Sequence, residues 1–187
     1  MKLPTLTAAP AVTLVDGSGQ AVNVRTGKPT LLAFFRDTTC PFCNFRIFEL
    51  TQRHAELSAA GLEIIAVFAS TPDEVARFTK LRPRPFRVVA DPANLAYQAY
   101  GIQRSFAGKL HAVFFKTRKW LAGMRAAGWL QALRGLGGLG TNNILPADFL
   151  IDESGYIRDV HYGEDAGDHI PFERIERFLA HPAPTRQ

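Results

Sequence analysis

Residues 30–43 have the sequence TLLAFFRDTTCPFC, an uninterrupted apolar run followed four residues later by two cysteines spaced three apart. The run Thr30–Phe35 predicts a β-strand that is buried on both faces. The residues after it predict a helix that begins at the cysteines and runs to Ala60, with Gly61 as its C-terminal stop. A buried strand that enters a Cys-x-x-Cys motif at a helix start is the feature from which the rest of the chain is interpreted.

The motif Cys40-Pro41-Phe42-Cys43 indicates redox chemistry. Three residues apart on a helix, the two cysteines share one face and lie within disulfide range. We expect Cys40 at the N-cap or in the first turn, where free backbone N–H groups and the helix dipole favour a thiolate. Cys43 follows one turn later and should be more buried. Cys40 is therefore predicted to be the more exposed and more acidic thiol, which attacks, and Cys43 the thiol that resolves.

Two other interpretations of the cysteine pair are weaker. The pair could be two core thiols that lie close by chance. A structural zinc site usually takes four ligands, and the chain has only two cysteines and five histidines without ligand-like spacing. The sequence predicts neither a metal nor a cofactor. All five histidines are expected at the surface: His54, His111, His161, His169 and His181.

Length and composition are those of a soluble globular protein. The chain has 187 residues, of which 47% are hydrophobic and 21% charged, and we expect one domain over residues 1–187. The net charge of +5 is too small to argue for nucleic acid by itself. Neither a secretory h-region nor an apolar run of membrane-spanning length is present, so the expected location is cytoplasmic. Structural disulfides are uncommon there, which favours a redox role for the dithiol.

The remaining hydrophobic pattern predicts alternating strands and helices, with a hairpin at each end of the sheet-forming region. The expected fold is α/β, with three layers, a mixed central sheet and an N-terminal hairpin. The predicted strands are Val12–Val15, Ala21–Val24, Glu63–Phe68, Phe86–Val89, Asp148–Ile151 and Tyr156–His161, and the further helices start at Thr71, at Asp91-Pro92 and at Pro171.

A basic segment interrupts this plan before the last hairpin. No acidic residue occurs between Asp91 and Asp148, whereas seven lysines and arginines do. We interpret about residues 104–143 as a helical insertion. It could be a lid over the dithiol, a helix on a membrane surface or a solvated cover. Trp120 and Trp129 do not fall on one helical stripe, which favours a lid or cover.

The chain resembles the thioredoxin-like superfamily and, within it, the alkyl hydroperoxide reductase/thiol-specific antioxidant group with its peroxiredoxin-like branch. The resemblance rests on Leu31–Phe35 before the dithiol, on Asp91-Pro92 with Tyr100-Gly101, and on residues 145–152, LPADFLID. It implies a thioredoxin-like fold. It also implies a cis-proline packed against the active disulfide, and this role falls on Pro146. The Leu145–Pro146 bond is therefore expected to be cis and to approach the Cys40 sulfur.

The predicted function is thiol–disulfide exchange, extending to hydroperoxide reduction. The substrates would be protein or small-molecule disulfides or hydroperoxides, and the electron donor thioredoxin or glutathione. No nucleic acid partner is predicted, and a membrane-surface partner is not favoured. The substrate face is expected to be shaped by Pro146, Leu145, Arg36, Arg46 and Thr39, although the two arginines could equally be solvated.

The peroxiredoxin pattern Pro-x-x-x-Thr-x-x-Cys fits neither cysteine. Counting back from Cys40 gives Asp37 and Ala33 in place of the threonine and the proline. This departure favours a dithiol reductase. Two alternatives stay open: a peroxiredoxin-like thiol peroxidase that uses the same cysteines, and a redox-sensing or binding module without turnover.

Overall fold

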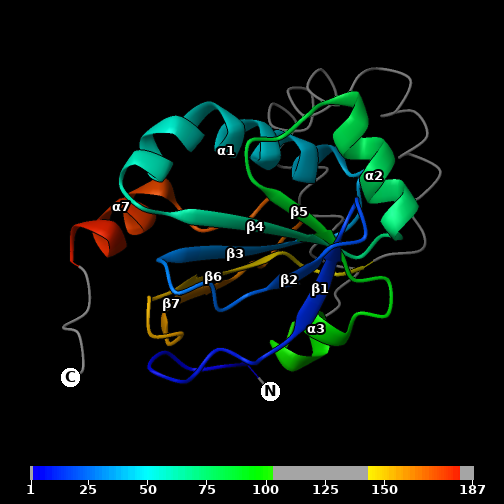
Figure 1. The fold of residues 1–187 in the computed structure, drawn as a ribbon. Coiled ribbons are helices and arrows are strands. Elements are labelled where there is room, and N and C mark those ends of the chain that lie inside the picture. The colour runs from blue at the N-terminus through cyan, green and yellow to red at the C-terminus, as the bar shows by residue number, and fades with distance from the viewer. Residues whose placement is uncertain (1, 103–142, 182–187) are drawn as a thin grey trace.

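The computed structural model describes residues 2–102 and 143–181, which form a seven-stranded mixed sheet covered by helices (Figure 1). The strand order is β2-β1-β5-β4-β3-β6-β7. Strands β3, β4 and β5 are parallel, and the other neighbours pair antiparallel. The strands are β1 (Thr13–Asp16), β2 (Ala21–Asn23), β3 (Thr30–Phe35), β4 (Glu63–Phe68), β5 (Arg87–Ala90), β6 (Ala147–Ile151) and β7 (Ile157–Tyr162). The predicted α/β class, mixed sheet and N-terminal hairpin are confirmed.

Strand β3 lies inside the sheet because its side chains are apolar on both faces. All six of its residues are buried, as the unbroken run in the sequence predicted. Leu31, Ala33 and Phe35 enter one hydrophobic core, and Leu32 and Phe34 enter the other. Each face of the sheet therefore needs its own helical cover.

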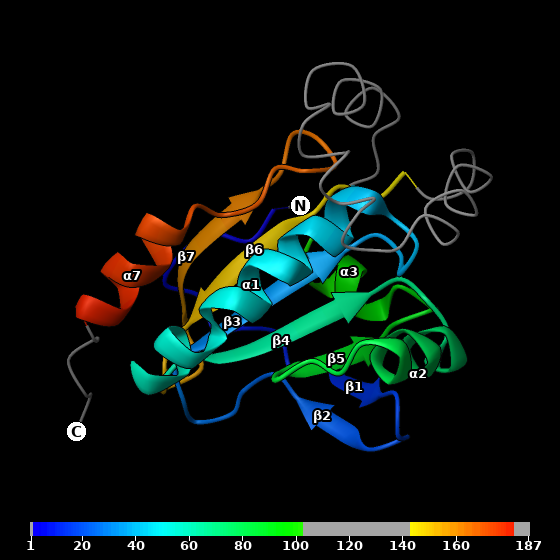
Figure 2. The same cartoon turned by 90° about the horizontal axis from the view of Figure 1, so that it is seen from above.

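The helices form two layers around the sheet. Helices α1 (Pro41–Ala59), α2 (Pro72–Leu81) and α7 (Phe172–Ala180) cover one face, and α3 (Leu95–Ala99) covers the other (Figures 1 and 2). Helix α1 connects β3 to the parallel strand β4, and its N-terminus therefore lies at the end of the sheet where β3 stops. The expected three-layer arrangement is present in the described residues.

Helix starts follow their capping chemistry. The helix predicted to start at Thr71 is observed as α2. Thr71 and Glu74 form a reciprocal capping box at its N-terminus. The helix expected from Asp91-Pro92 begins only at Leu95. The Asp91 carboxylate accepts hydrogen bonds from the Leu95 and Ala96 amides at 3.0 and 2.8 Å. Asp91 thus satisfies the free amides of α3 from outside the helix.

The basic insertion expected over about residues 104–143 lies outside the described residues, apart from Asn143. The predictions made for this segment therefore stay predictions, namely a lid over the dithiol, a membrane-surface helix or a solvated cover. Trp120 and Trp129 also lie outside the described residues. Among the helices that the structure describes, none combines the length and apolarity needed to cross a membrane.

A tightly wound segment, the 163–170 loop, connects β7 to the residues before α7. The Gly163 amide donates to the Pro146 carbonyl oxygen at 2.9 Å, which extends the β6–β7 pairing by one step. A Cβ atom on Gly163 would lie 2.4 Å from the Asp168 carbonyl oxygen and 2.8 Å from Pro146 Cγ. The loop can therefore take this path only with glycine at position 163.

We expect Gly163→Ala to lower the free energy of unfolding by about 1–3 kcal/mol, because its methyl group would overlap backbone atoms that cannot rotate away. Urea unfolding followed by circular dichroism measures this loss. The control is Gly19→Ala, where no atom lies within 4 Å of the added carbon but φ is +85°; its cost should be that of backbone strain alone, about 1–2 kcal/mol. Parent-like stability of Gly163→Ala would contradict the steric argument.

Candidate functional site

The loop between β3 and α1 is held by its own side chains. The Asp37 carboxylate accepts hydrogen bonds from the Thr39 amide at 3.0 Å and the Thr39 hydroxyl at 2.6 Å. Asn44, one turn into α1, donates from Nδ2 to the carbonyl oxygens of Thr38 and Cys40, both at 2.9 Å. The path of the chain into the first cysteine is thus fixed on both sides.

Cys40 is the N-cap of α1. Its backbone is extended (φ −66°, ψ 121°), Pro41 occupies the first helical turn, and no acidic residue lies in that turn. The Cys43 amide donates to Cys40 Sγ at 3.5 Å, so the sulfur takes the place that a serine or aspartate oxygen usually has. The predicted helix start is therefore observed, and it directs the otherwise free Cys43 N–H group at the Cys40 sulfur.

Both cysteines are buried, and Cys40, which was expected to be the more exposed of the two, exceeds Cys43 only slightly. Cys40 is 2% and Cys43 1% exposed, and both are free thiols. They share a core with Phe35, Phe42 and many other apolar side chains. The sequence pattern placed Cys40 at a helix end, but it could not show that this end is packed into the core rather than open to solvent.

The two thiols differ in acidity in the expected order. Burial raises the pKa of Cys40, but a hydrogen bond from the Cys43 thiol, the Arg36 charge and the Cys43 amide outweigh it, so the pKa lies below its ordinary value. The pKa of Cys43 is raised well above its ordinary value, by burial and then by the hydrogen bond and negative charge of Cys40. Cys40 is therefore the more acidic of the two thiols.

Arg36 is a buried cation beside the dithiol. It directly follows β3, is 7% exposed, and its guanidinium lies 3.8 Å from the Asp37 carboxylate. Its charge lowers the pKa of Cys40 and opposes the rise at Cys43, whereas Asp37 raises both. Of the two arginines expected near the thiols, Arg36 is the one that the structure brings to them.

Arg46 lies on another side of α1. Its NH2 donates to the Ile170 carbonyl oxygen at 2.6 Å, NH1 lies 3.5 Å from Glu49, and the guanidinium stacks on the Phe172 ring at 4.2 Å. These contacts join α1 to the residues around the start of α7. Arg46 is thus mostly buried in this interface rather than solvated, and it also lines a hollow of about 350 Å³ beside the dithiol helix.

Pro146 differs from the expectation in its peptide bond. No bond within residues 2–102 and 143–181 is cis, so Leu145–Pro146 is trans. An X-Pro bond favours trans by about 0.5–1 kcal/mol, and here the residue continues the extended path into β6 through the bond from Gly163. Ala147 pairs with Phe34, so Pro146 does lie at the sheet end where the dithiol is. Its described contacts are with Gly163, and together with Leu145 it lines a small hollow of about 170 Å³.

Sequence reasoning missed several residues that support the site. The Tyr97 hydroxyl contacts the carbonyl oxygens of Phe35 and Val67, at the ends of β3 and β4, and burial raises the pKa of this tyrosine well above its ordinary value. Asn44 was also missed. A tyrosine on a distant helix gives no local signal, whereas Asn44, one residue after the second cysteine, could have been suspected from its position.

One histidine is not at the surface. The His169 side chain is only 3% exposed and faces the buried Asp148 carboxylate. The histidine prediction is therefore wrong at this position. Spacing alone could not reveal it, because the partner lies 21 residues earlier on another strand.

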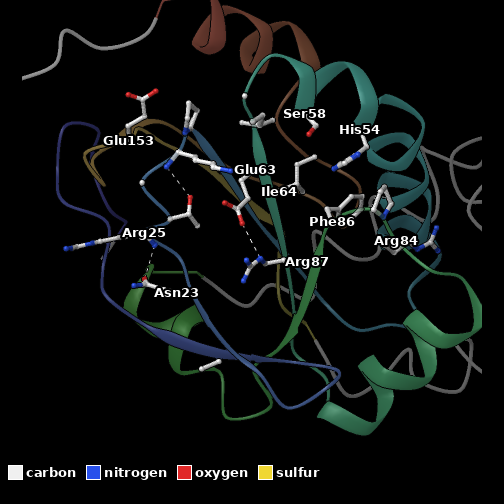
Figure 3. A pocket seen from close by; sticks show the side chains of 18 residues that line it. Asn23, Arg25, His54, Ser58, Glu63, Ile64, Arg84, Phe86, Arg87 and Glu153 are labelled. Atoms are coloured by element: carbon white, nitrogen blue, oxygen red, sulfur yellow. Dashed lines mark hydrogen bonds and ion pairs between the residues drawn. The ribbon is translucent and has the colours of Figure 1, made fainter.

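A large hollow lies away from the dithiol. It measures about 1180 Å³ and is formed by the C-terminal part of α1, the starts of β4 and β5, and the residues before β3. Figure 3 shows Arg25 and Arg84 on opposite sides of it, with the Arg87–Glu63 ion pair (3.2 Å) between them. Because its cations do not converge, the hollow is not a candidate anion site. A smaller hollow of about 350 Å³ borders the dithiol helix between Phe42, Phe45 and His169.

Comparison with known proteins agrees with this geometry. The family model of the AhpC/TSA family matches residues 6–160.

The chain belongs to the AhpC/TSA family. It is similar to peroxiredoxin Bcp of Escherichia coli strain K12, with 25% identity over 107 residues that cover 55% of the chain and 69% of the relative. Two solved structures share the fold. Peroxidoxin BcpB of Mycobacterium tuberculosis has a TM-score of 0.65 at 15% identity and covers 94% of both chains.

The second structure is a Chlorobium tepidum protein that carries the provisional name thiol:disulfide interchange protein DsbE. It has a TM-score of 0.61 at 20% identity and covers 95% of this chain and 99% of its own. Family membership places the protein among the peroxiredoxin-like thiol oxidoreductases of thioredoxin-like fold, and makes it an enzyme of the thiol peroxidase or oxidoreductase class.

We expect Arg36→Gln to raise the pH at which Cys40 becomes reactive toward iodoacetamide, because it removes the charge that lowers the pKa of this thiol. Arg36→Lys should retain most of the parent behaviour. Alkylation rates across pH, with mass mapping of the modified cysteine, measure both. Arg53→Gln removes an equal charge from the exposed side of α1 and should leave the profile unchanged. Preferential labelling of Cys43 at neutral pH would reverse the order of acidity.

Proposed function

We propose that the protein is a thiol–disulfide oxidoreductase in which Cys40 attacks, Cys43 resolves, and Arg36 stabilises the Cys40 thiolate. The observation that carries the proposal is the opposite direction of the two thiol pKa values within one buried pair at a helix N-terminus. Two structural thiols in a core would both be shifted upward by burial. A pair in which the pKa of one thiol is lowered and that of the other is raised suits thiol–disulfide exchange.

The exchange proceeds in two displacements. The Cys40 thiolate attacks one sulfur of a substrate disulfide, the S–S bond breaks, and the departing thiolate takes up a proton. Cys43 then loses its proton and attacks Cys40 Sγ, which releases the second substrate thiol and forms the Cys40–Cys43 disulfide. An external dithiol or two molecules of glutathione return two electrons and two protons to the enzyme. The closed loop is small, so the disulfide adds little stability to the fold.

A lowered pKa has limited value for attack. Lowering a thiol pKa from about 8.5 to about 6.5 raises the thiolate fraction at pH 7 roughly 25-fold. Nucleophilicity falls about 8-fold over the same interval. The net gain in the attacking step is about threefold. The larger benefit is that Cys40 becomes a better leaving group in those exchange steps in which a thiolate attacks the sulfur bonded to Cys40.

A hydroperoxide substrate is the second candidate, and the burial of Cys40 favours it. With 2% of Cys40 exposed, a small peroxide reaches the sulfur with less rearrangement than a protein disulfide. The thiolate would attack the terminal oxygen, the O–O bond would break, and the alcohol would leave. The resulting sulfenic acid on Cys40 would condense with the Cys43 thiol and release water. The peroxiredoxin name of the Escherichia coli relative supports this candidate.

We expect steady-state turnover of a disulfide or a hydroperoxide when the purified protein is supplied with thioredoxin, thioredoxin reductase and NADPH, or with glutathione and its reductase. NADPH consumption is followed for each substrate in turn. Cys40→Ser should abolish turnover. Cys43→Ser should retain a single attack and accumulate the mixed disulfide or the sulfenic acid on Cys40, detectable by mass spectrometry.

The same assay separates the alternatives. Turnover with peroxides alone would make the protein a thiol peroxidase, and turnover with disulfides alone a reductase. One stoichiometric oxidation without turnover under any reductant would contradict the enzyme and indicate a redox sensor. Activity of Cys40→Ser at the parent rate would overturn the assignment of the attacking thiol.

A further inference from the structure

A carboxylate and an imidazole are buried together on the face of the sheet that α1 covers. Asp148 lies in β6 opposite Ala33 of β3, and its side chain is 1% exposed. His169 Nδ1 lies 3.0 and 3.1 Å from the two carboxylate oxygens. Burial would raise the pKa of Asp148, but the His169 and Arg46 charges and the Ile170 amide hold it below its ordinary value. The charged groups near the pair are Arg46 of α1 and Arg174 of α7.

The pair connects three elements. Asp148 Oδ2 also accepts a hydrogen bond from the Ile170 amide at 2.8 Å. The Ile170 carbonyl oxygen in turn accepts from Arg46 of α1. One carboxylate in β6 therefore fixes the C-terminal end of the 163–170 loop, and the same loop residue is tied to the dithiol helix.

Burying the imidazole of His169 costs free energy. Its Nε2 is buried and has no hydrogen-bond partner among the described residues. An unsatisfied buried nitrogen costs about 1–3 kcal/mol. The ring packs against Phe35 with centroids 4.8 Å apart, a contact that phenylalanine could also make. The histidine is therefore explained by its bond to Asp148 rather than by its packing.

The loop that this bond anchors packs on the dithiol motif. A Cβ atom on Gly167 would lie 3.1 Å from the ring of Phe42, the residue between Pro41 and Cys43, so the glycine backbone rests against that ring. Ala166 and Ile170 share one hydrophobic cluster with both cysteines. Position 167 thus contacts the first turn of α1, while positions 169 and 170 are held by Asp148.

We propose that Asp148 and His169 are positioning residues for the dithiol. The pair holds the 163–170 loop against Phe42, and this contact fixes the first turn of α1 in which Cys40 accepts the Cys43 amide. Cys40 reactivity depends on that geometry, because the helix N–H groups act on the sulfur only over hydrogen-bond distances. The inference rests on the proposed function in that Cys40 is the reactive thiol.

The alternative is that the pair only stabilises the fold, and the choice of variants separates the two. Removing one partner leaves a buried group unpaired, which destabilises the protein for either reason. The double variant Asp148→Asn with His169→Phe removes the carboxylate and the imidazole together, keeps an acceptor for the Ile170 amide and keeps a ring on Phe35. His169→Asn keeps the hydrogen bond to Asp148 and loses the ring, because the side-chain N–H of asparagine can take the place of Nδ1.

The measurement is the alkylation rate of Cys40 against pH in the full chain, with urea unfolding to confirm that each variant is folded. We expect the double variant to react about 10-fold more slowly at neutral pH, with its profile displaced upward, since small misplacements of reacting groups cost rates of this order. The alkylation rate of His169→Asn should stay within about threefold of the parent rate. On a logarithmic scale, this limit is half of the tenfold decrease expected for the double variant. The control Glu63→Gln with Arg87→Gln breaks an ion pair between β4 and β5 that lies away from the dithiol and should react like the parent.

A folded double variant with the parent alkylation profile would overturn the proposal and leave the pair a purely structural role. If the double variant does not fold, His169→Asn and His169→Gln decide, because glutamine cannot place an N–H at the Nδ1 position. Equal Cys40 reactivity in those two would then overturn it. Alkylation needs no turnover, so a protein inactive toward every disulfide and hydroperoxide would refute the proposed function without deciding this inference.

Discussion

The site depends on the attraction between one buried cation and one buried sulfur. Arg36 and Cys40 both lie in an environment from which water is largely excluded, where a charge interaction is stronger than in solvent. Burial alone would keep Cys40 protonated, as it does Cys43. The hydrogen bond from the Cys43 thiol, the Arg36 charge and the Cys43 amide together reverse that effect at one sulfur only. The fold has to deliver all of these groups to the same place.

Strand β3 is the element that delivers them. It is buried on both faces and ends at Phe35, so the next residue, Arg36, enters the core region rather than solvent. Asp37 and Asn44 then fix the four-residue path to the helix cap. Tyr97, from the opposite face, contacts the last carbonyl of β3. The position of the reactive sulfur is thus determined by the end of one central strand and not by a mobile surface loop.

Local sequence signals predicted the strand, the helix start and the dithiol, because each rests on residues close together in the chain. TLLAFF has one interpretation as a doubly buried strand, and Cys-Pro-Phe-Cys has few interpretations besides a helix cap with redox chemistry. The features that these local signals could not show depend on contacts between residues far apart in the chain. The burial of Cys40, the interface role of Arg46 and the pairing of His169 with Asp148 all depend on how the residues after β7 fold back over α1.

The prediction of a cis Leu145–Pro146 bond was wrong for a different reason. It was taken from the family resemblance of residues 145–152 and not from the physical properties of those residues. The register confirms the place of Pro146 at the sheet end beside β3, yet the segment that packs on Phe42 is the 163–170 loop. In this chain, the residues that face the dithiol motif therefore come from after β7 as well as from the start of β6. Sequence resemblance identified the right edge of the sheet and the wrong isomer of the Leu145–Pro146 bond.

In the proposed exchange, the opposite shifts of the two thiol pKa values also set the order in which the sulfurs react. Among the causes that raise the pKa of Cys43, burial comes first, and the hydrogen bond and charge of Cys40 follow. Once Cys40 is bound to a partner's sulfur it carries no negative charge, so the last two causes vanish while the lowering effect of Arg36 remains. Cys43 therefore becomes more acidic at the step in which it has to attack, and it stays protonated before that step. The same buried charge serves both sulfurs in turn, first holding the Cys40 thiolate and then favouring the Cys43 thiolate that displaces the partner.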